Sequence, residues 1–144
     1  MPIIVDANRA ADFTRPLGGR AKEILERINR NKIRIVIGGK LGLELAKTKF
    51  GPLLVELLRS GRAHRYSDSD VETESILVQA MALNSDDPHV LALARVSKTR
   101  LVYTNDQNLM KDLKNIRIVS PKGKIIASTT SAKITCVLLD NHAG

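Results

Sequence analysis

Two aspartates, Asp6 and Asp106, each follow a short apolar run. The runs are residues 2–5 and 101–105, and their β-branched composition predicts buried strands. In an open parallel sheet, ligands bind outside the carboxyl ends of the strands. The sequence therefore predicts that both carboxylates lie at a ligand-binding edge.

Two further carboxylates accompany apolar helical patterns. Glu44 lies within residues 41–46, and Asp87 opens the apolar segment 88–94. If folding gathers all four acids, they supply oxygen donors, which Mg²⁺ and Mn²⁺ prefer. Four acids without a metal would repel one another, and a divalent ion removes that penalty. The set therefore predicts a Mg²⁺ or Mn²⁺ site.

Each aspartate also has an ordinary structural explanation. Asp6 suits a turn at the end of a strand. Asp106 suits the N-cap of a helix over 107–113, and both Asp86 and Asp87 suit the N-cap of the helix that follows them. At this stage either reading holds for each residue alone.

Glu44 has an alternative of its own. It flanks an apolar helical stripe that includes Leu41 and Leu45, so its carboxylate can reach a cleft at the edge of that stripe. Lys40 and Lys47 lie on the same flank, which also suits a surface charge cluster with (i, i+4) pairing.

The chain is strongly basic. Of its 144 residues, 23 are Lys or Arg and 15 are Asp or Glu, which gives a formal net charge of +8. This excess favours a polyanion such as RNA as partner, since neutralising phosphates releases counterions, and it is equally compatible with an acidic protein. With two Phe, two Tyr and no Trp, a base-stacking platform is not expected.

The sequence also predicts where the protein resides. We expect no membrane span, because the chain has no apolar run of the required length. The N-terminus does not resemble a signal peptide, so we expect a cytoplasmic protein. Cys136 is the one cysteine, which excludes an intrachain disulfide and a Cys-rich zinc site.

Short apolar strands alternate with amphipathic helices along the chain. This alternation predicts an α/β fold, a three-layer α/β/α sandwich with a central, mainly parallel sheet. Strands are expected at 3–5, 33–37, 101–103 and 116–119, and helices at 20–29, 41–48, 53–61, 69–83, 88–94 and 107–113. We expect one domain over residues 1–127. Residues 128–144 would form a C-terminal extension, with a loop at 128–131 and either an extra strand at 134–139 or a flexible tail.

The order of these pieces resembles the PIN-domain nucleases, including the toxin ribonucleases of toxin–antitoxin pairs. The resemblance spans roughly residues 2–120. The matching segments are Ile3–Asn8, Leu41–Ala46 with Glu44, Asp87–Ala94 and Leu101–Asp106. Each segment is short and degenerate, and their order, spacing and context together carry the match.

The resemblance implies a site and an activity. Asp6, Glu44, Asp87 and Asp106 would hold Mg²⁺ or Mn²⁺ for RNA phosphodiester cleavage, and these four would be the catalytic residues. Thr104 matches a hydroxyl position that lines the site, and Asn8 would support Asp6. Many members carry a further acid where this chain has Asn108. Asp86 competes with Asp87 for the third position, and the spacing to Ala92 and Ala94 favours Asp87.

The resemblance also suggests partners. RNA would be held by the cations that border the matching segments, namely Arg9, Lys40, Lys47 and Lys49. A small antitoxin protein and a second copy of the chain are further expected partners, with the apolar helices at 53–58 and 76–83 as a dimer surface. His89 is expected on a helix surface, turned away from Asp87. Because of Asn108, the alternative is an inactive PIN-like module that binds RNA or protein.

Overall fold

Five parallel strands form the centre of the computed structural model, which describes residues 1–141. The strand order is β3-β2-β1-β4-β5. Their bounds are β1 Pro2–Val5, β2 Arg34–Ile37, β3 Ala63–Arg65, β4 Leu101–Tyr103 and β5 Lys124–Ile126. In the centre of the sheet, Ile3 lies opposite both Ile35 and Leu101. All the strands therefore point the same way, and their carboxyl ends share one edge.

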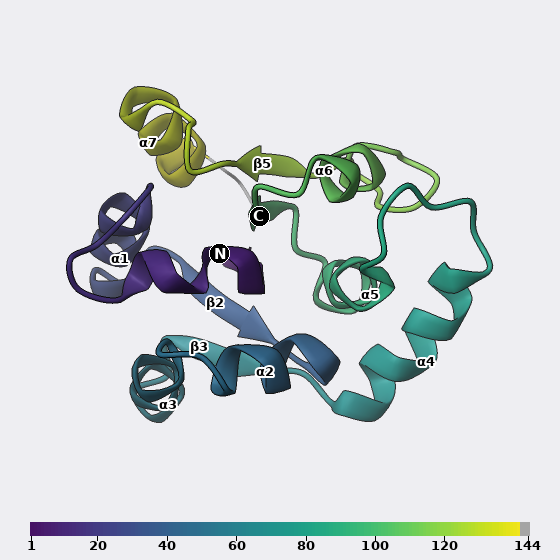
Figure 1. Cartoon of the computed structure of the whole chain (residues 1–144), viewed down its shortest axis with the longest axis horizontal. Helices are drawn as coiled ribbons and strands as arrows, with labels where there is room; N and C mark the ends of the chain where they lie inside the picture. Colours follow the sequence, from purple (N-terminus) through teal and green to yellow (C-terminus); the bar gives the residue numbers. More distant parts are fainter. Residues whose placement is uncertain (142–144) are drawn as a thin grey trace.

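Helices cover both faces of this sheet. Figure 1 shows α1, α3 and α7 on one side and α5 and α6 on the other, with α4 beyond α5. Their bounds are α1 Ala21–Asn29, α2 Gly39–Ala46, α3 Gly51–Arg59, α4 Asp68–Gln79, α5 Pro88–Ser97, α6 Gln107–Leu113 and α7 Ala132–Asn141. A 3₁₀ helix, η1, spans Ala7–Phe13 directly after β1. The three-layer α/β/α architecture predicted from the sequence is confirmed.

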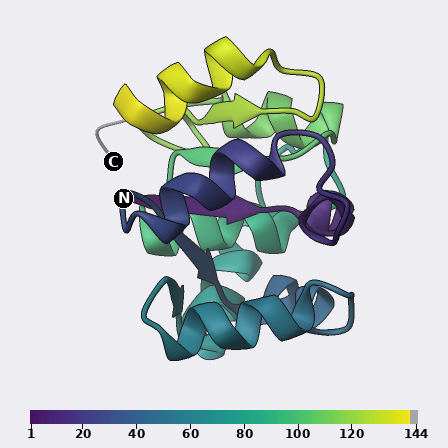
Figure 2. The same ribbon diagram turned by 90° about the vertical axis from the view of Figure 1, so that its left-hand side faces the viewer.

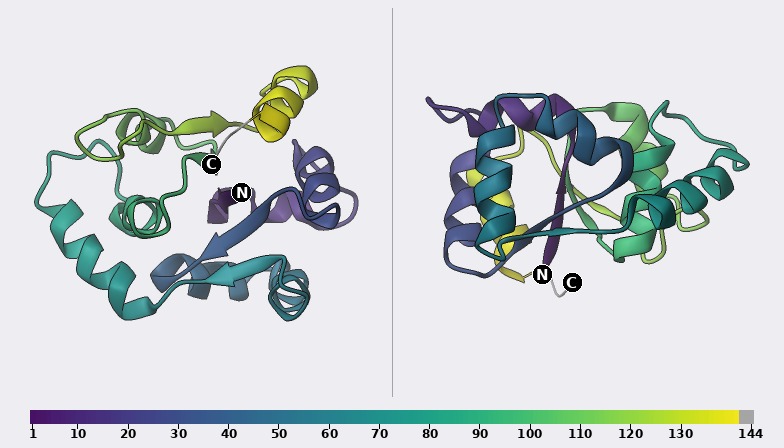
Figure 3. Two further views of the ribbon diagram at one scale, coloured as in Figure 1. Left: turned by 180° about the vertical axis from the view of Figure 1, so that it is seen from behind. Right: turned by 90° about the horizontal axis from the view of Figure 1, so that it is seen from below.

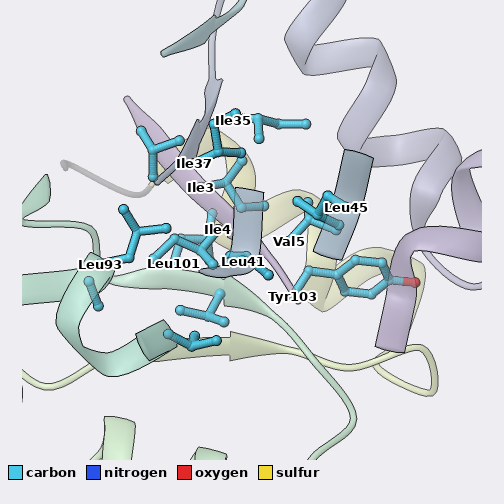
Figure 4. Close-up of a cluster of buried hydrophobic side chains, with 14 of the residues drawn as sticks. Ile3, Ile4, Val5, Ile35, Ile37, Leu41, Leu45, Leu93, Leu101 and Tyr103 are labelled. Carbon is cyan, nitrogen blue, oxygen red and sulfur yellow. The ribbon is translucent and has the colours of Figure 1, made fainter. Parts of the chain in front are cut away.

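The core is aliphatic, as the scarcity of aromatics requires. The central strands are fully buried, and side chains of β1 and β2 pack against Leu41 and Leu45 of α2 and Leu93 of α5 (Figure 4). Strands buried on both faces read as continuous apolar runs, which is why residues 3–5 and 101–103 are recognisable in the sequence. Only the polar residues that follow these strands are free to face a ligand.

The C-terminal extension is a helix. Residues 134–139 were expected to form either an extra strand or a flexible tail, but they belong to α7, which lies along α1 (Figure 2). Thr135 and Leu139 are buried while Ile134 and Val137 are exposed, which is helical spacing. Arg27 of α1 binds Asp140 of α7 through two hydrogen bonds of 3.0 Å. Residues 142–144 of the predicted extension lie outside the described part.

Two more predicted features are wrong. Residues 116–119 are a turn, because the N–H groups of Ile118 and Val119 both donate to the carbonyl of Asn115 instead of to a neighbouring strand. The helix expected at 69–83 begins one residue earlier, and its N-cap is Ser67, whose hydroxyl accepts from the N–H of Asp70. The short edge strand β3 was not foreseen, because Ala63–Arg65 contains no apolar run.

The views from behind and below show β2 and β3 side by side, with α4 projecting past the sheet (Figure 3). Within residues 1–141, no helix has the length and apolar character that a membrane crossing needs.

Candidate metal centre

Asp6 occupies the carboxyl end of β1, in the middle of the sheet. Its N–H donates to the carbonyl of Tyr103 at 3.0 Å, which extends the β1–β4 pairing by one residue. Its side chain is 5% exposed, and its Oδ2 accepts a 2.7 Å hydrogen bond from the hydroxyl of Thr104. A carboxylate this deeply buried is costly unless something compensates its charge.

Thr104 connects Asp6 to Asp106. While its hydroxyl donates to Asp6, the same oxygen accepts from the N–H of Asp106 at 3.0 Å. Asp106 is also the N-cap of α6, because its Oδ1 accepts from the N–H groups of Asn108 and Leu109 at 3.0 and 3.1 Å. The capping reading of Asp106 is therefore correct, and it leaves the second carboxylate oxygen free of that duty.

Asp87 stands at the N-cap of α5, and its side chain makes no capping hydrogen bond. The ordinary explanation for this aspartate is therefore not realised. The loop before it is fixed by Asp112, whose buried carboxylate accepts from the N–H groups of Asn84 and Ser85 at 2.9 Å. Asp112 thus holds the start of α5 against α6, a role that no sequence pattern predicted.

His89 was expected on a helix surface, but it is buried. Its side chain is 7% exposed, and its Nε2 lies 3.6 Å from Oδ1 of Asp87 and 3.8 Å from Oε1 of Glu44. This nitrogen has no hydrogen-bond partner within residues 1–141. Two residues along a helix would point away from each other, but Asp87 has φ −116° and ψ 60° and is not helical, so that rule does not apply.

Two of the four acids, Asp6 and Asp87, have raised pKa values. Burial raises the pKa of Asp6, the hydrogen bond from Thr104 opposes that rise, and the charge of Asp106 adds to it. Burial also raises the pKa of Asp87, and the charges of Asp6, Asp106 and Glu44 raise it further. Such mutual repulsion is what a bound divalent cation relieves.

As the side chains stand, no group of three or more His, Cys, Asp or Glu residues in the described part of the chain is placed to hold a metal ion. The donor chemistry nonetheless fits one, because the four acids are oxygen ligands, the pKa values of Asp6 and Asp87 are raised, and His89 offers an unpartnered buried nitrogen. Mg²⁺ retains several waters and needs only one or two carboxylates directly. The predicted ligand set stays a prediction.

The expected RNA-binding cations lie at two places near these acids. Arg9 follows Asp6 in η1 and is bound to Asp12 at 3.1 Å. Lys40 is exposed on α2, 4.0 Å from Oε1 of Glu44, and Lys47 and Lys49 are exposed just after α2 ends. Lys40 therefore lies beside Glu44, Lys47 and Lys49 are exposed after the end of the same helix, and Arg9 is partly neutralised by Asp12.

The remaining expected residues are less engaged. Asn8 and Asn108 are both exposed, and Asn108 contacts Asp106 through its backbone N–H. Asp86 is exposed, whereas Asp87 is half-buried. Of the two adjacent aspartates, Asp87 is thus the one directed at the other acids, which agrees with the spacing argument.

Tyr103 fixes η1 beside the site. Its hydroxyl donates to Asp12 at 2.6 Å and accepts from the N–H of Arg20 at 2.9 Å. Burial and the bond to Asp12 raise the pKa of Tyr103 to about 12. Gly19 has φ +50°, and a Cβ there would clash with the Tyr103 hydroxyl, so glycine is required at this close approach.

Comparison with known proteins gives a structural similarity and no sequence match. No family model and no curated protein matches the sequence. A chain in the crystal structure of VapBC2 from Rickettsia felis bound to a DNA fragment from their promoter is similar, with a TM-score of 0.49 and 14% sequence identity. The match covers 88% of this chain and 98% of that one.

Proposed function

We propose that this protein is a divalent-metal-dependent ribonuclease that hydrolyses RNA phosphodiester bonds. The proposal rests on the gathering of like-charged acids at the carboxyl edge of the sheet. Thr104 is hydrogen-bonded to both Asp6 and Asp106, and His89 lies within 4 Å of the carboxylates of Asp87 and Glu44. A structural protein gains nothing from such an arrangement. A metal-binding enzyme does, because the bound ion offsets the repulsion.

The four acids would hold Mg²⁺ or Mn²⁺, which when bound polarises the scissile phosphate and lowers the pKa of a bound water. Thr104 favours the ionised form of Asp6 by donating a hydrogen bond to it and aligns Asp106 by accepting from its N–H. Lys40, Lys47 and Lys49 would hold the RNA backbone next to Glu44. His89, between Glu44 and Asp87, would position these two carboxylates.

The resemblance of the four acidic segments to PIN-domain toxins supports a narrower proposal, that the chain is the toxin of a type II toxin–antitoxin pair. Its partner would then be a small antitoxin protein, whose gene is expected beside this one. Cleavage with no such neighbour would leave a ribonuclease without the toxin role.

The test is RNA cleavage by purified protein. With Mn²⁺, the wild type should cut single-stranded or structured RNA, and Asp6→Asn should lose cleavage because the most buried acid no longer carries a charge. Circular dichroism should show that the variant is folded. Equal cleavage by the two proteins would indicate a contaminating nuclease and refute the proposal.

The second candidate function is a PIN-like module that binds RNA or protein without cutting. Two observations favour it: Asn108 replaces an acid found in many members of the resembled family, and no metal-ready cluster exists within residues 1–141. Tight RNA binding without metal-stimulated cleavage across varied RNAs would support this alternative.

A further inference from the structure

A second hollow lies at the end of the molecule away from the carboxylates. It has a volume of about 630 Å³ and is lined by the last turn of α5, the residues that lead into β4, and the turn at 116–121. Thr99 and Arg100 precede β4, whereas Thr104 and Asp106 follow it. The candidate metal centre and this cavity therefore lie at opposite ends of the same strand.

The lining is cationic. Arg95, Lys98, Arg100 and Arg117 line the cavity, and Glu74 is the acid among the described lining residues. Glu74 is already bound to Nε of Arg95 at 2.6 Å. Within residues 1–141, Lys98, Arg100 and Arg117 have no acidic partner within 4 Å. Three uncompensated positive charges thus converge on one hollow.

Part of this lining is held rigidly. The Nη1 of Arg95 donates to the carbonyl of Ile118 at 2.9 Å, so the guanidinium ties α5 to the turn at 116–121. Ile118 and Val119 present an apolar wall to the cavity, although they are almost fully buried. Because these side chains are already held in place, little conformational entropy is lost when a ligand binds against them.

We propose that this cavity binds a small organic phosphate, whose apolar or planar body packs on Ile118 and Val119 while its phosphate meets Lys98, Arg100 and Arg117. The volume lies within the range of small-molecule sites, which combine apolar walls with a few convergent polar groups. Guanidinium and ammonium groups bind phosphate through charge-assisted hydrogen bonds. An extended RNA backbone would use the charges and leave the apolar wall unused.

The probe is 1-naphthyl phosphate, titrated by calorimetry in buffer with EDTA, with the binding site mapped by amide chemical shifts. One molecule should bind per chain, with the largest shifts near Thr99 and Val119. Inorganic phosphate and 1-naphthalenemethanol, which each carry half of the chemistry, should bind much more weakly. AMP as a competitor separates the sources of the ligand: displacement indicates a nucleotide, and its absence indicates another organic phosphate.

Three variants test the geometry. Arg117→Glu should weaken binding about tenfold or more, because a charge-assisted hydrogen bond becomes a repulsion. Lys133 occupies an exposed position of α7, away from the cavity. Lys133→Glu makes the same change in net charge and should bind the probe as the wild type does. Val96→Trp should abolish binding by filling the hollow that Val96 lines.

The proposal is overturned if the wild type does not bind the probe, or if Arg117→Glu and Lys133→Glu weaken binding equally, since that means diffuse attraction to a basic protein. Unchanged binding by Val96→Trp, or equally tight binding of inorganic phosphate, overturns it as well. Asp6→Asn should leave this binding intact. The ribonuclease proposal and the phosphate-binding proposal can therefore be refuted independently of each other.

Discussion

The hydroxyl of Thr104 joins the two aspartates that end the central strands. It donates to the carboxylate of Asp6 and accepts from the backbone of Asp106, so one side chain fixes both positions. The sequence offered Thr104 only through the family resemblance, because nothing in its spacing distinguishes a buried hydroxyl from any strand-end threonine. The hydrogen bonds explain why a threonine is useful there.

Thr104→Val removes this hydroxyl while keeping the shape of the side chain. We expect Mn²⁺ affinity and RNA cleavage to fall about tenfold to a hundredfold, the usual effect of losing a group that orients a metal ligand. Thr104→Ser retains the hydroxyl and should stay close to the wild type. Equal losses in the two variants would show that packing, and not the hydrogen bond, is what matters.

Among elements, α5 is the one that most needs exact placement. Its first turn carries His89, its N-cap is Asp87, and its start is held by the carboxylate of Asp112. Burial alone would raise the pKa of Asp112, but hydrogen bonds from the N–H groups of Asn84 and Ser85 outweigh burial and lower it. The ionised form is therefore preferred in the folded protein.

Asp112→Asn should lower the free energy of unfolding by about 2–3 kcal/mol at neutral pH, because an amide donor then faces two backbone donors. The pKa of Asp112 is lower in the folded protein than in the unfolded chain, so its carboxylate stabilises the folded state fully above the unfolded pKa of about 4. This stabilisation is lost as the pH falls through the lower pKa of the folded state. Urea unfolding at pH 7 and pH 2.5 should show the difference between wild type and variant shrinking in acid. A pH-independent difference would contradict this.

The elements show where sequence reasoning works and where it stops. Residues 3–5 and 101–103 were predicted because strands buried on both faces are apolar throughout. Ile116–Val119 also contains three β-branched apolar residues, yet it is a turn that lines the cavity near Arg95. His89 was misplaced because the helical periodicity was extended by one residue to Asp87, whose backbone is not helical. Composition predicts burial better than it predicts backbone conformation.

At the scale of the whole molecule, apolar side chains remain exposed on α4. Ile76 and Leu77 are 61% and 54% exposed, and this helix projects beyond the sheet (Figure 3). The apolar patterns at 53–58 and 76–83 predicted a dimer surface, and Ile76 and Leu77 lie in the second of these segments. Adjacent exposed apolar residues on a projecting helix favour that proposal, since such patches mark interaction sites.

We therefore expect a homodimer, with twice the 15.8 kDa mass of the chain in light scattering coupled to size exclusion. Ile76→Glu should shift the protein to a monomer, because it places a charge in an apolar contact. As the control, Ile134→Glu on α7 replaces a similarly exposed apolar residue outside both predicted dimer helices and should leave the dimer intact. A wild-type monomer would refute the dimer.

Mn²⁺ titration by calorimetry will show whether the four acids at the carboxyl edge of the sheet bind one divalent cation. Adjacent aspartates provide the matched pair, since Asp87 faces the other acids and Asp86 is exposed. Asp87→Asn should weaken Mn²⁺ binding about tenfold or more, because a carboxylate ligand is lost, and Asp86→Asn should bind as the wild type does. No Mn²⁺ binding by the wild type, or equal losses in both variants, would contradict the account.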